Sequence, residues 1–394
     1  MNPYFFVGWA GGREGSPVET VYGLSRELVK RGHEVAIYTT DAFNKSGRNK
    51  KQAGETEIDG IRVHEFSSIG RTLGIRHHII ISPSLAEALR REISQFDVLH
   101  LHEYRTLPNI TAHRQATKHG IPYVLQAHGS VPVLGKRVLK QAYDRLWGRR
   151  ILSDASKLIA VSEMEAEHYR ASGVAEEQIT VVPNAIDLSL FSALPEKGVF
   201  KRKHGMADKR MVLFLGRIAP VKGIDLLIRA FALLLKEVGD VSLVIAGPDD
   251  GDLSSLKNLT RELKVEGRVL FPGALHGRAK LEAYVDAEVY VLPSVYDIFG
   301  ITVLEALACG TPVIVTDRCG IAGDIKDRAG IVVSREERAL KEAMSDLLAD
   351  GAMRRMFITQ GRQMVREKFT WERVAEKIEE IYNDILAGRA SSQR

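Results

Sequence analysis

The feature that most constrains the fold of this chain is an alternation of short apolar runs with amphipathic helical patterns. The runs of the first half are EVAIYTT, IRVHEF, VLHLH, YVLQAH, KLIAVS and ITVVPN, and the second half repeats the pattern with MVLFLG, VSLVIAG, RVLFPG, VYVLPS, PVIVTD and GIVVS. Short runs rich in valine and isoleucine, separated by helical segments, are typical of parallel strands joined by crossover helices. The sequence therefore predicts an α/β protein with two doubly wound domains.

The length of the chain, 394 residues, is too great for one ordinary hydrophobic core. Its hydrophobic content of 45% and its 34 glycines indicate a globular protein rich in tight turns. We expect an N-terminal domain over residues 1–187, a C-terminal domain over residues 188–370, and a final helix over residues 371–394 that packs back on the N-terminal domain. The polar stretch at residues 188–209 interrupts the periodicity, so we expect the domain junction there.

Composition also restricts the location and the partners. No apolar run approaches the ~20 residues needed to cross a bilayer, and the first residues lack a basic segment followed by an apolar one. The two cysteines, Cys309 and Cys319, are too few for a disulfide framework. These features predict a cytoplasmic protein. The net charge of +5 favours an anionic partner, which leaves phosphate, membrane and nucleic acid open.

Two carboxylates lie close together in the segment SVYDIFGITVLEALACGTPVIVTD, residues 294–317. Asp297 falls in a turn after a strand, and Glu305 falls about one turn inside the apolar helix that follows. The first amides of that helix face a phosphate if one binds at its mouth, and they belong to Gly300, Ile301 and Thr302. A buried carboxylate needs hydrogen-bond donors, which the two hydroxyls of a ribose would supply. The alternatives are that Asp297 caps the helix and that Glu305 bonds to a neighbouring domain.

Basic side chains follow the strand MVLFLG. The loop RIAPVKGID places Arg217 and Lys222 around a proline and a glycine before a helix. Basic groups beside free helix amides form an anion site, for which a diphosphate is the natural candidate, although two solvated charges would give the same pattern. A glycine-rich loop, GWAGGREGSPVE, offers a second set of amides but lacks the dinucleotide fingerprint G-x-G-x-x-G.

Histidines gather at two strand ends of the first half. His128 follows YVLQA and precedes a glycine, while VLHLHE contains His100, His102 and Glu103. Alternation places His100 and His102 on one face of their strand. A zinc site would need a third ligand at a recognisable spacing, and none follows from the sequence, so we predict no metal. A single histidine is usually structural, which leaves the role of His128 open.

These motifs together resemble the retaining glycosyltransferases of family four. The segment YDIFGITVLEALACGTPVI carries two acidic residues separated by seven others, which is similar to the E-x7-E motif of that family. LGRIAPVKGID is similar to its Gly-Arg and Lys-Gly pair, VVPNAID to its VPNG-D segment, and RELVKRGHEVAIYTT to its first helix and second strand. The resemblance covers nearly the whole chain and implies the GT-B fold, in which two Rossmann-like domains face each other across a cleft.

The resemblance implies transfer of a hexose-type sugar from a nucleotide-diphosphate sugar to a glycan, glycolipid or lipid-linked acceptor. It also implies retention of configuration, because in this family the leaving diphosphate helps remove the acceptor proton on the same face of the sugar. Neither a metal nor a cofactor is expected, since arginine, lysine and helix amides supply the positive field. Nucleic acid is not an expected partner.

The resemblance also assigns roles to residues. Glu305 would bind the donor ribose, and Arg217 with Lys222 would hold the diphosphate. Asp297 would hold hydroxyls of the transferred sugar, and His128 would lie near its C6 hydroxyl and the reacting phosphate. The remaining members of the expected donor site are Phe299, Gly300, Ile301 and Thr302.

The chain departs from the family pattern in several places. Position 297 is Asp where the family usually has Glu, which shortens the reach by one methylene, and Ala185 stands where glycine is common. Only Met1 precedes NPYFF, so we expect the first strand to be clipped or largely missing. GWAGGREGSPVE is longer than the common form of this loop, so either Gly12 or Gly15 is expected to meet the reacting groups.

Two other functions stay open at the level of sequence: a nucleotide-sugar epimerase of the same fold, and a non-catalytic protein that binds sugar nucleotides. The sequence does not determine the donor base, the sugar or the acceptor. UDP-glucose, UDP-N-acetylglucosamine and GDP-mannose are all compatible with the motifs.

Residues 135–152, GKRVLKQAYDRLWGRRIL, form a basic amphipathic pattern. Its basic members are Lys136, Arg137, Lys140, Arg145, Arg149 and Arg150. One interpretation is an ordinary surface helix whose apolar side packs on the first domain. The other is a peripheral contact with an anionic membrane at its inner face, in which Trp147 is an interfacial anchor.

Overall fold

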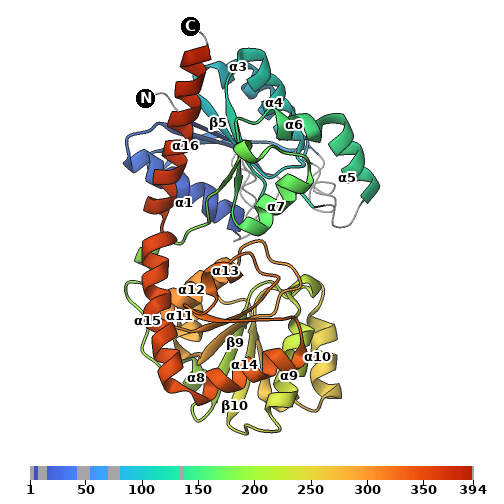
Figure 1. Ribbon diagram of the computed structural model, residues 1–394, viewed down its shortest axis with the longest axis vertical. Helices are drawn as coiled ribbons and strands as arrows, with labels where there is room; N and C mark the ends of the chain where they lie inside the picture. The colour runs from blue at the N-terminus through green and yellow to red at the C-terminus, as the bar shows by residue number, and fades with distance from the viewer. Residues whose placement is uncertain (1–3, 8–15, 42–53, 70–79, 133–136, 393–394) are drawn as a thin grey trace. The chain divides into compact units, whose positions relative to one another are not determined.

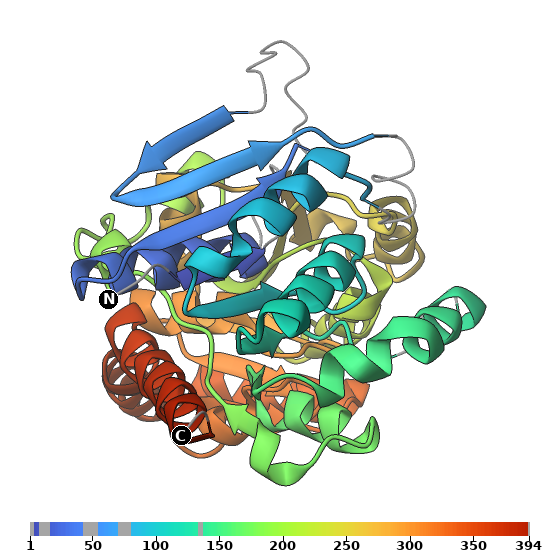
Figure 2. The same ribbon diagram turned by 90° about the horizontal axis from the view of Figure 1, so that it is seen from above.

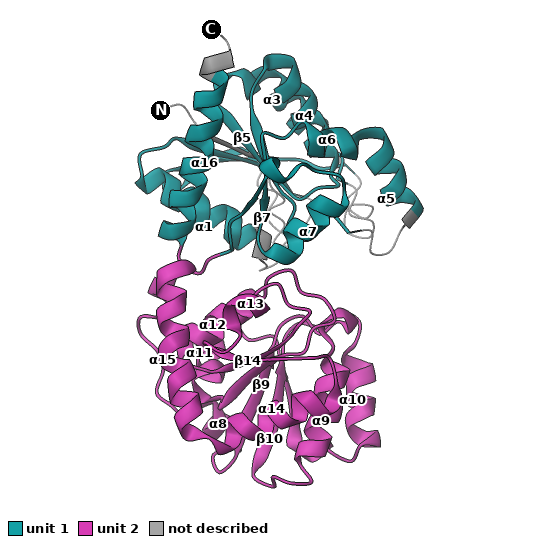
Figure 3. Cartoon of the chain, in the orientation of Figure 1, with its two compact units in different colours: residues 1–184, 371–394 teal, residues 185–370 magenta. Residues whose placement is uncertain are grey.

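The computed structural model describes residues 4–7, 16–41, 54–69, 80–132 and 137–392. The chain divides into two compact units, one made of residues 1–184 and 371–394 and the other of residues 185–370 (Figure 3). The boundary therefore falls between Asn184 and Ala185, and the polar stretch at residues 188–209 lies wholly inside unit 2. Figure 1 gives the element labels used below. No helix of the described ranges is long and apolar enough to cross a bilayer.

The core of unit 1 is a sheet whose described strands run in the order β3-β4-β2-β1-β5-β6-β7-β8. The strands are β1 (Tyr4–Val7), β2 (Val35–Thr40), β3 (Gly54–Ile58), β4 (Ile61–Phe66), β5 (Val98–His102), β6 (Tyr123–Gln126), β7 (Lys157–Ala160) and β8 (Ile179–Val181). All neighbours pair in parallel except β3 with β4. The order reverses at β1, and ligands of doubly wound sheets bind at the carboxyl ends of strands beside such a reversal.

The first strand corrects one expectation. Tyr4–Val7 pairs in parallel with both β2 and β5, so the first strand is present at the centre of the sheet rather than largely missing. The segment NPYFFV therefore contains the first strand and does not follow it. The antiparallel edge strand β3 was not predicted from the sequence.

Helices cover the sheet of unit 1 (Figure 1). They are α1 (Ser16–Lys30), α3 (Pro83–Glu92), α4 (Leu107–His119), α5 (Arg137–Tyr143), the π-helix η2 (Asp144–Gly148), α6 (Arg149–Ser153), α7 (Glu163–Ala171) and α16 (Trp371–Ser392), with 3₁₀ turns η1 (Ile93–Gln95) and η3 (Glu176–Gln178). Ser82 caps α3, because its hydroxyl accepts a hydrogen bond from the amide of Leu85 at 3.3 Å.

The last helix, α16, packs against α1 (Figure 2). Gly23 permits the close approach, because a Cβ at this position would lie 2.2 Å from the Trp371 ring. Glu379 of α16 accepts hydrogen bonds from Arg31 and His33, both at 2.7 Å. A single helix from the far end of the sequence therefore completes the core of unit 1.

Unit 2 holds a six-stranded sheet, all parallel, in the order β11-β10-β9-β12-β13-β14. The strands are β9 (Arg210–Leu215), β10 (Val241–Ala246), β11 (Val269–Gly273), β12 (Val289–Leu292), β13 (Val313–Thr316) and β14 (Gly330–Val333). The helices are α8 (Val199–Lys203), α9 (Ile224–Leu234), α10 (Leu253–Glu262), α11 (Gly277–Asp286), α12 (Ile301–Cys309), α13 (Ala322–Ile325), α14 (Glu337–Ala349) and α15 (Gly351–Lys368), with 3₁₀ turns η4 (Leu188–Phe191), η5 (Pro220–Lys222) and η6 (Glu266–Arg268). All six strands coincide with the predicted apolar runs.

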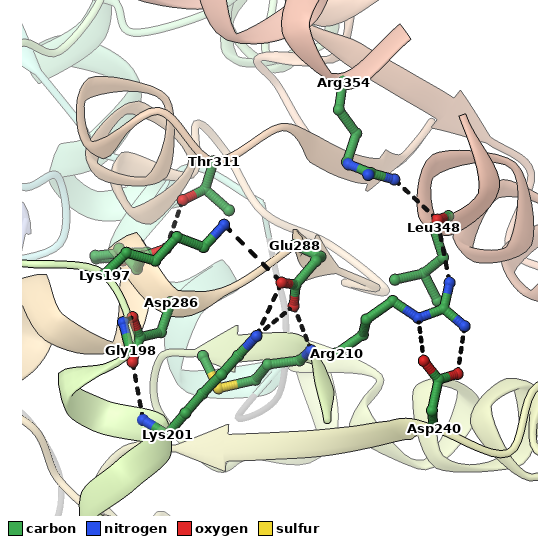
Figure 4. Close-up of polar contacts among 12 residues, drawn as sticks. Lys197, Gly198, Lys201, Arg210, Asp240, Asp286, Glu288, Thr311, Leu348 and Arg354 are labelled. Carbon is green, nitrogen blue, oxygen red and sulfur yellow. Dashed lines mark hydrogen bonds and ion pairs between the residues drawn. The ribbon is translucent and has the colours of Figure 1, made fainter. Parts of the chain in front are cut away.

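Two carboxylates tie the short helix α8 to this sheet (Figure 4). Asp286 is fully buried and accepts hydrogen bonds from the amides of Gly198 and Lys201, which begin α8. Glu288 accepts from the ammonium of Lys201 at 2.8 and 3.0 Å and from the amide of Met211 in β9. Each buried charge is therefore compensated by hydrogen-bond donors.

Candidate active site

The loop after β9 lies against the loop after β12. Gly223 makes this possible: its φ is +62°, and a Cβ here would lie 2.3 Å from the carbonyl oxygen of Pro293. The amide of Val295 donates to the carbonyl of Val221 at 2.9 Å, which joins the two loops. Lys222 and Asp297, 75 positions apart in the sequence, form an ion pair with an Nζ–Oδ2 distance of 2.5 Å. Two of the predicted site residues thus meet directly.

Two backbone hydrogen bonds hold the loop that carries Asp297 against residues 318–320. The amide of Asp297 donates to the carbonyl of Arg318 at 3.1 Å, and its carbonyl accepts from the amide of Gly320 at 2.8 Å. Its carboxylate also accepts from the amide of Phe299 at 3.3 Å. The Phe299 ring is buried and packs edge-on against Phe369, so only the backbone of this predicted donor residue is available to a ligand.

The N-terminus of helix α12 has no side-chain cap among the described residues. Gly300 is its N-cap residue with φ +85°. The first amides of a helix lack partners within the helix and attract anions. Behind Ile301, the hydroxyl of Thr302 bonds to that of Tyr290 at 2.6 Å, which fixes the first turn. The role of Gly300, Ile301 and Thr302 in binding a phosphate stays a prediction.

Glu305 is 7% exposed and has protein partners of its own. Lys280 binds Oε1 at 2.6 Å, and the hydroxyl of Tyr284 donates to Oε2 at 2.9 Å. Both lie on α11, one helical turn apart. Burial and the neighbouring carboxylate raise the pKa of Tyr284 well above its usual value, so the phenol stays a donor. Sequence reasoning missed both partners, and their spacing of four on one helix is the signal that could have suggested a shared contact.

Arg217 lies after β9 but makes a different pair. Its side chain is 54% exposed and forms an ion pair with Asp250 in the loop between β10 and α10. Arg217 and Lys222 are therefore each paired with an aspartate, and an anionic ligand that binds either side chain would have to replace or share that aspartate.

His128 occupies a strained turn at the end of β6. Its φ is +51°, unusual for a residue with a side chain, and Gly129 follows with φ +81°. Glu165 of α7 holds this turn, because its carboxylate accepts from the amide of Gly129 at 2.5 Å and from that of Val161 at 2.8 Å. Burial raises the pKa of Glu165 to about 7. No sequence motif pointed to this carboxylate.

Three histidine rings stack behind the turn. The ring centroids of His100 and His102 lie 4.3 Å apart, and those of His102 and His128 lie 5.2 Å apart. His102 Nδ1 and His128 Nε2 are 2.9 Å apart, and His100 Nδ1 lies 2.7 Å from the hydroxyl of Tyr382 in α16. Burial lowers the pKa of His100 and His128 to about 3 and that of His102 well below its usual value, so the rings are neutral. Within the described ranges, no group of three or more His, Cys, Asp or Glu residues could hold a metal ion.

The basic segment of unit 1 is helical from α5 through η2 to α6. In Figure 2 this segment, coloured green, projects from the rest of the unit. Its exposed apolar side chains are Val138 (81%), Leu139 (55%) and Leu146 (61%). Trp147 is half-buried and packs on the core beside Tyr143, and its role as an interfacial anchor stays a prediction. A cavity of about 750 Å³ lies alongside and is lined in part by Arg145 and Arg149.

Some predicted residues lie outside the described ranges. They are Gly12, Gly15 and Lys136, together with the side chain of Arg137. Their assigned roles stay predictions.

Comparison with known proteins decides the family. The model for glycosyltransferase family 4 matches residues 18–190, and the model for group 1 glycosyl transferases matches residues 196–364. The chain belongs to the family 4 glycosyltransferases. An uncharacterized glycosyltransferase of Methanocaldococcus jannaschii is 28% identical over 91% of this chain and 92% of its own length. A D-inositol 3-phosphate glycosyltransferase of Stackebrandtia nassauensis is also 28% identical, over 98% of this chain and 90% of its own.

Solved structures agree on the fold of this glycosyltransferase. The Anabaena protein HepE, crystallised with UDP-glucose, superimposes with a TM-score of 0.78 at 18% identity, covering 98% of this chain and all of the HepE chain. The fold is therefore GT-B, with two Rossmann-like domains.

Proposed function

We propose that this chain is a retaining glycosyltransferase that moves a hexose-type sugar from a nucleotide-diphosphate sugar to a glycan, glycolipid or lipid-linked acceptor without a metal. The observation that carries the proposal is that Lys222 pairs with Asp297 just before the uncapped N-terminus of α12 in unit 2. An ammonium, a carboxylate and free helix amides at one point suit a ligand that combines phosphates with sugar hydroxyls.

The ion pairs of the site suggest how the donor binds. A diphosphate takes the place of Asp297 beside Lys222, and the released carboxylate accepts hydrogen bonds from the sugar. Arg217 exchanges Asp250 for the diphosphate in the same way. Lys280 and Tyr284 each occupy one oxygen of Glu305, and the remaining lone pairs of the carboxylate can accept hydrogen bonds from the ribose hydroxyls. No metal is required, since lysine, arginine and helix amides neutralise the leaving diphosphate.

The acceptor is assigned by class. The Stackebrandtia relative is named for a phosphorylated polyol acceptor, D-inositol 3-phosphate, and HepE was crystallised with UDP-glucose as a donor of the proposed kind. The exposed Val138, Leu139 and Leu146 beside arginines favour a lipid-linked or membrane acceptor, reached by peripheral contact of α5 with anionic lipid. Such a contact would hold the protein at the inner face of a cell membrane.

The test is binding and transfer with a panel of nucleotide sugars. A donor at about 100 times its dissociation constant should stabilise the chain by roughly 2.7 kcal/mol in thermal unfolding. Release of nucleotide diphosphate only when acceptor is present indicates transfer, whereas inversion at one sugar carbon without acceptor indicates an epimerase. Activity should persist in EDTA.

Matched variants make the test specific. Lys222→Ala should weaken transfer roughly 10- to 150-fold, because it removes a charge-assisted contact worth about 1.5–3 kcal/mol. Lys209→Ala is the control, since Lys209 pairs with Asp208 at 2.8 Å just before the opposite end of β9. Equal activity of the two variants would exclude the diphosphate role.

A further inference from the structure

The hydrogen bond between two histidines fixes which face of His128 is available. His128 Nε2 lies 2.9 Å from His102 Nδ1. Both rings are neutral, and a neutral imidazole has one donor and one acceptor nitrogen, so one ring donates and the other accepts. The bond occupies Nε2 of His128 whichever ring holds the proton. Only Nδ1 is left for another group.

The second ring nitrogen of His128 is Nδ1. Nδ1 is buried and has no hydrogen-bond partner among the described residues. A buried polar atom without a partner costs free energy unless a ligand or water satisfies it. His128 follows the carboxyl end of β6, at the edge of the sheet where ligands of this fold bind.

We propose that His102 is a positioning residue that holds His128 through Nε2, so that His128 presents Nδ1 to the bound donor. This inference rests on the proposed function. Ring stacking on His102 and the turn held by Glu165 stop the imidazole from flipping to exchange its nitrogens. His100 stacks on His102 but bonds to Tyr382 and not to His128. It therefore contacts the positioning residue without holding His128 directly.

The first test exchanges one nitrogen at a time. An asparagine amide reaches the place of Nδ1, and a glutamine amide reaches that of Nε2. His128→Asn should therefore keep at least about tenfold more turnover than His128→Gln, which is the range of one hydrogen bond at a reacting group. Greater turnover of the glutamine variant, or equal turnover of the two, would overturn the assignment of Nδ1.

The second test separates positioning from stability. His102→Leu should lower kcat about tenfold or more while the dissociation constant for donor changes less than about twofold, and His102→Asn should restore most of kcat because it returns a polar atom near Nδ1. His100→Leu is the matched control, with the same strand and the same burial. Equal losses of kcat at positions 100 and 102, or no rescue by asparagine, would make His102 structural only.

The third test does not require activity. Nitrogen spectra of the full-length protein labelled at histidine report which ring nitrogen of His128 carries the proton. His102→Asn should shift the Nε2 resonance of His128, and adding nucleotide sugar to the wild type should shift its Nδ1 resonance. If the wild type transfers no sugar but the Nε2 shift occurs, the proposed function fails and the positioning role stands. An unchanged Nε2 resonance overturns the positioning role.

Discussion

At the scale of single residues, the donor site is assembled from charges that already neutralise one another. Lys222 pairs with Asp297, and Glu305 pairs with Lys280. Each pair places opposite charges within hydrogen-bond distance of each other. A ligand that binds one of these side chains has to replace or share its partner. Its affinity is therefore the difference between the free energy of the new contacts and that of the ion pair.

Competition between Asp297 and a diphosphate leads to the first prediction. Asp297→Asn removes the carboxylate that occupies Lys222, so free nucleoside diphosphate should bind about three- to tenfold more tightly than to the wild type. Transfer of sugar should fall in the same variant, because the group that holds the sugar hydroxyls is weakened. Calorimetric titration with UDP and GDP checks the affinity, and weaker binding of both would contradict the exchange.

A glycine carries the contact between the two site loops, which gives the second prediction. Gly223→Ala places a methyl group 2.3 Å from the carbonyl of Pro293 at a φ of +62°. Both effects should lower the free energy of unfolding by about 1–3 kcal/mol in urea titrations. Gly239→Ala is the control, since an added Cβ there meets nothing within 4 Å. Similar losses in both variants would show that the close approach is not rigid.

At the scale of elements, the apolar runs predicted their strands because their hydrophobicity alone identifies buried parallel strands. β3 escaped prediction for the opposite reason: GETEI is exposed throughout, and its pairing depends on β4. The same limit applies to the site: local motifs predicted single residues, but not contacts between distant segments. Asp297, Glu305 and Lys222 were found as motif residues, but the pairing of Lys222 with Asp297 spans 75 positions and is set by the packing of two loops, which no local pattern records.

Strand β5 gives a prediction on pH. Burial lowers the pKa of His100 in the folded state to about 3, against about 6.5 in the unfolded chain. The unfolded state therefore takes up a proton first, and stability present above pH 6.5 is lost as the pH falls toward 3. Between pH 7 and pH 5 the wild type should lose about 2 kcal/mol more unfolding free energy than His100→Leu.

The prediction compares the pH dependence of unfolding free energy in the wild type with that in His100→Leu. Contributions from titratable groups that both proteins share cancel in this comparison. Glu103 and Glu165, whose pKa is raised to about 7 by burial, act in the opposite direction in both proteins. Parallel pH profiles of wild type and His100→Leu in urea unfolding would mean that His100 is protonated in the fold.

At the scale of the whole molecule, unit 1 is built from both ends of the chain, and unit 2 from one continuous stretch. The contacts of α16 at Trp371, Glu379 and Tyr382 are all made with unit 1. The three tryptophans of the chain lie outside residues 185–370, so tryptophan fluorescence reports unit 1 alone.

Removing the last helix is therefore the fourth prediction. A chain ending at Thr370 should lose more than about 4 kcal/mol of unfolding free energy in unit 1, because several large apolar side chains lose their burial. Fluorescence in urea measures this loss, while a chain ending at Ala390 keeps the three contacts and is the control. An unchanged fluorescence midpoint would show that α16 is dispensable.

The divided construction of unit 1 also sets the order of events during synthesis on the ribosome. Residues 1–184 emerge first, yet the surface around Gly23 waits for Trp371 and the rest of α16. At ~5–20 residues per second, that wait lasts roughly ten to forty seconds. The growing chain exposes an apolar surface during this time, which is the kind of surface that chaperones bind. Unit 2 begins to emerge after residues 1–184, but all of its residues emerge before α16. Unit 2 can therefore complete its fold before unit 1 does.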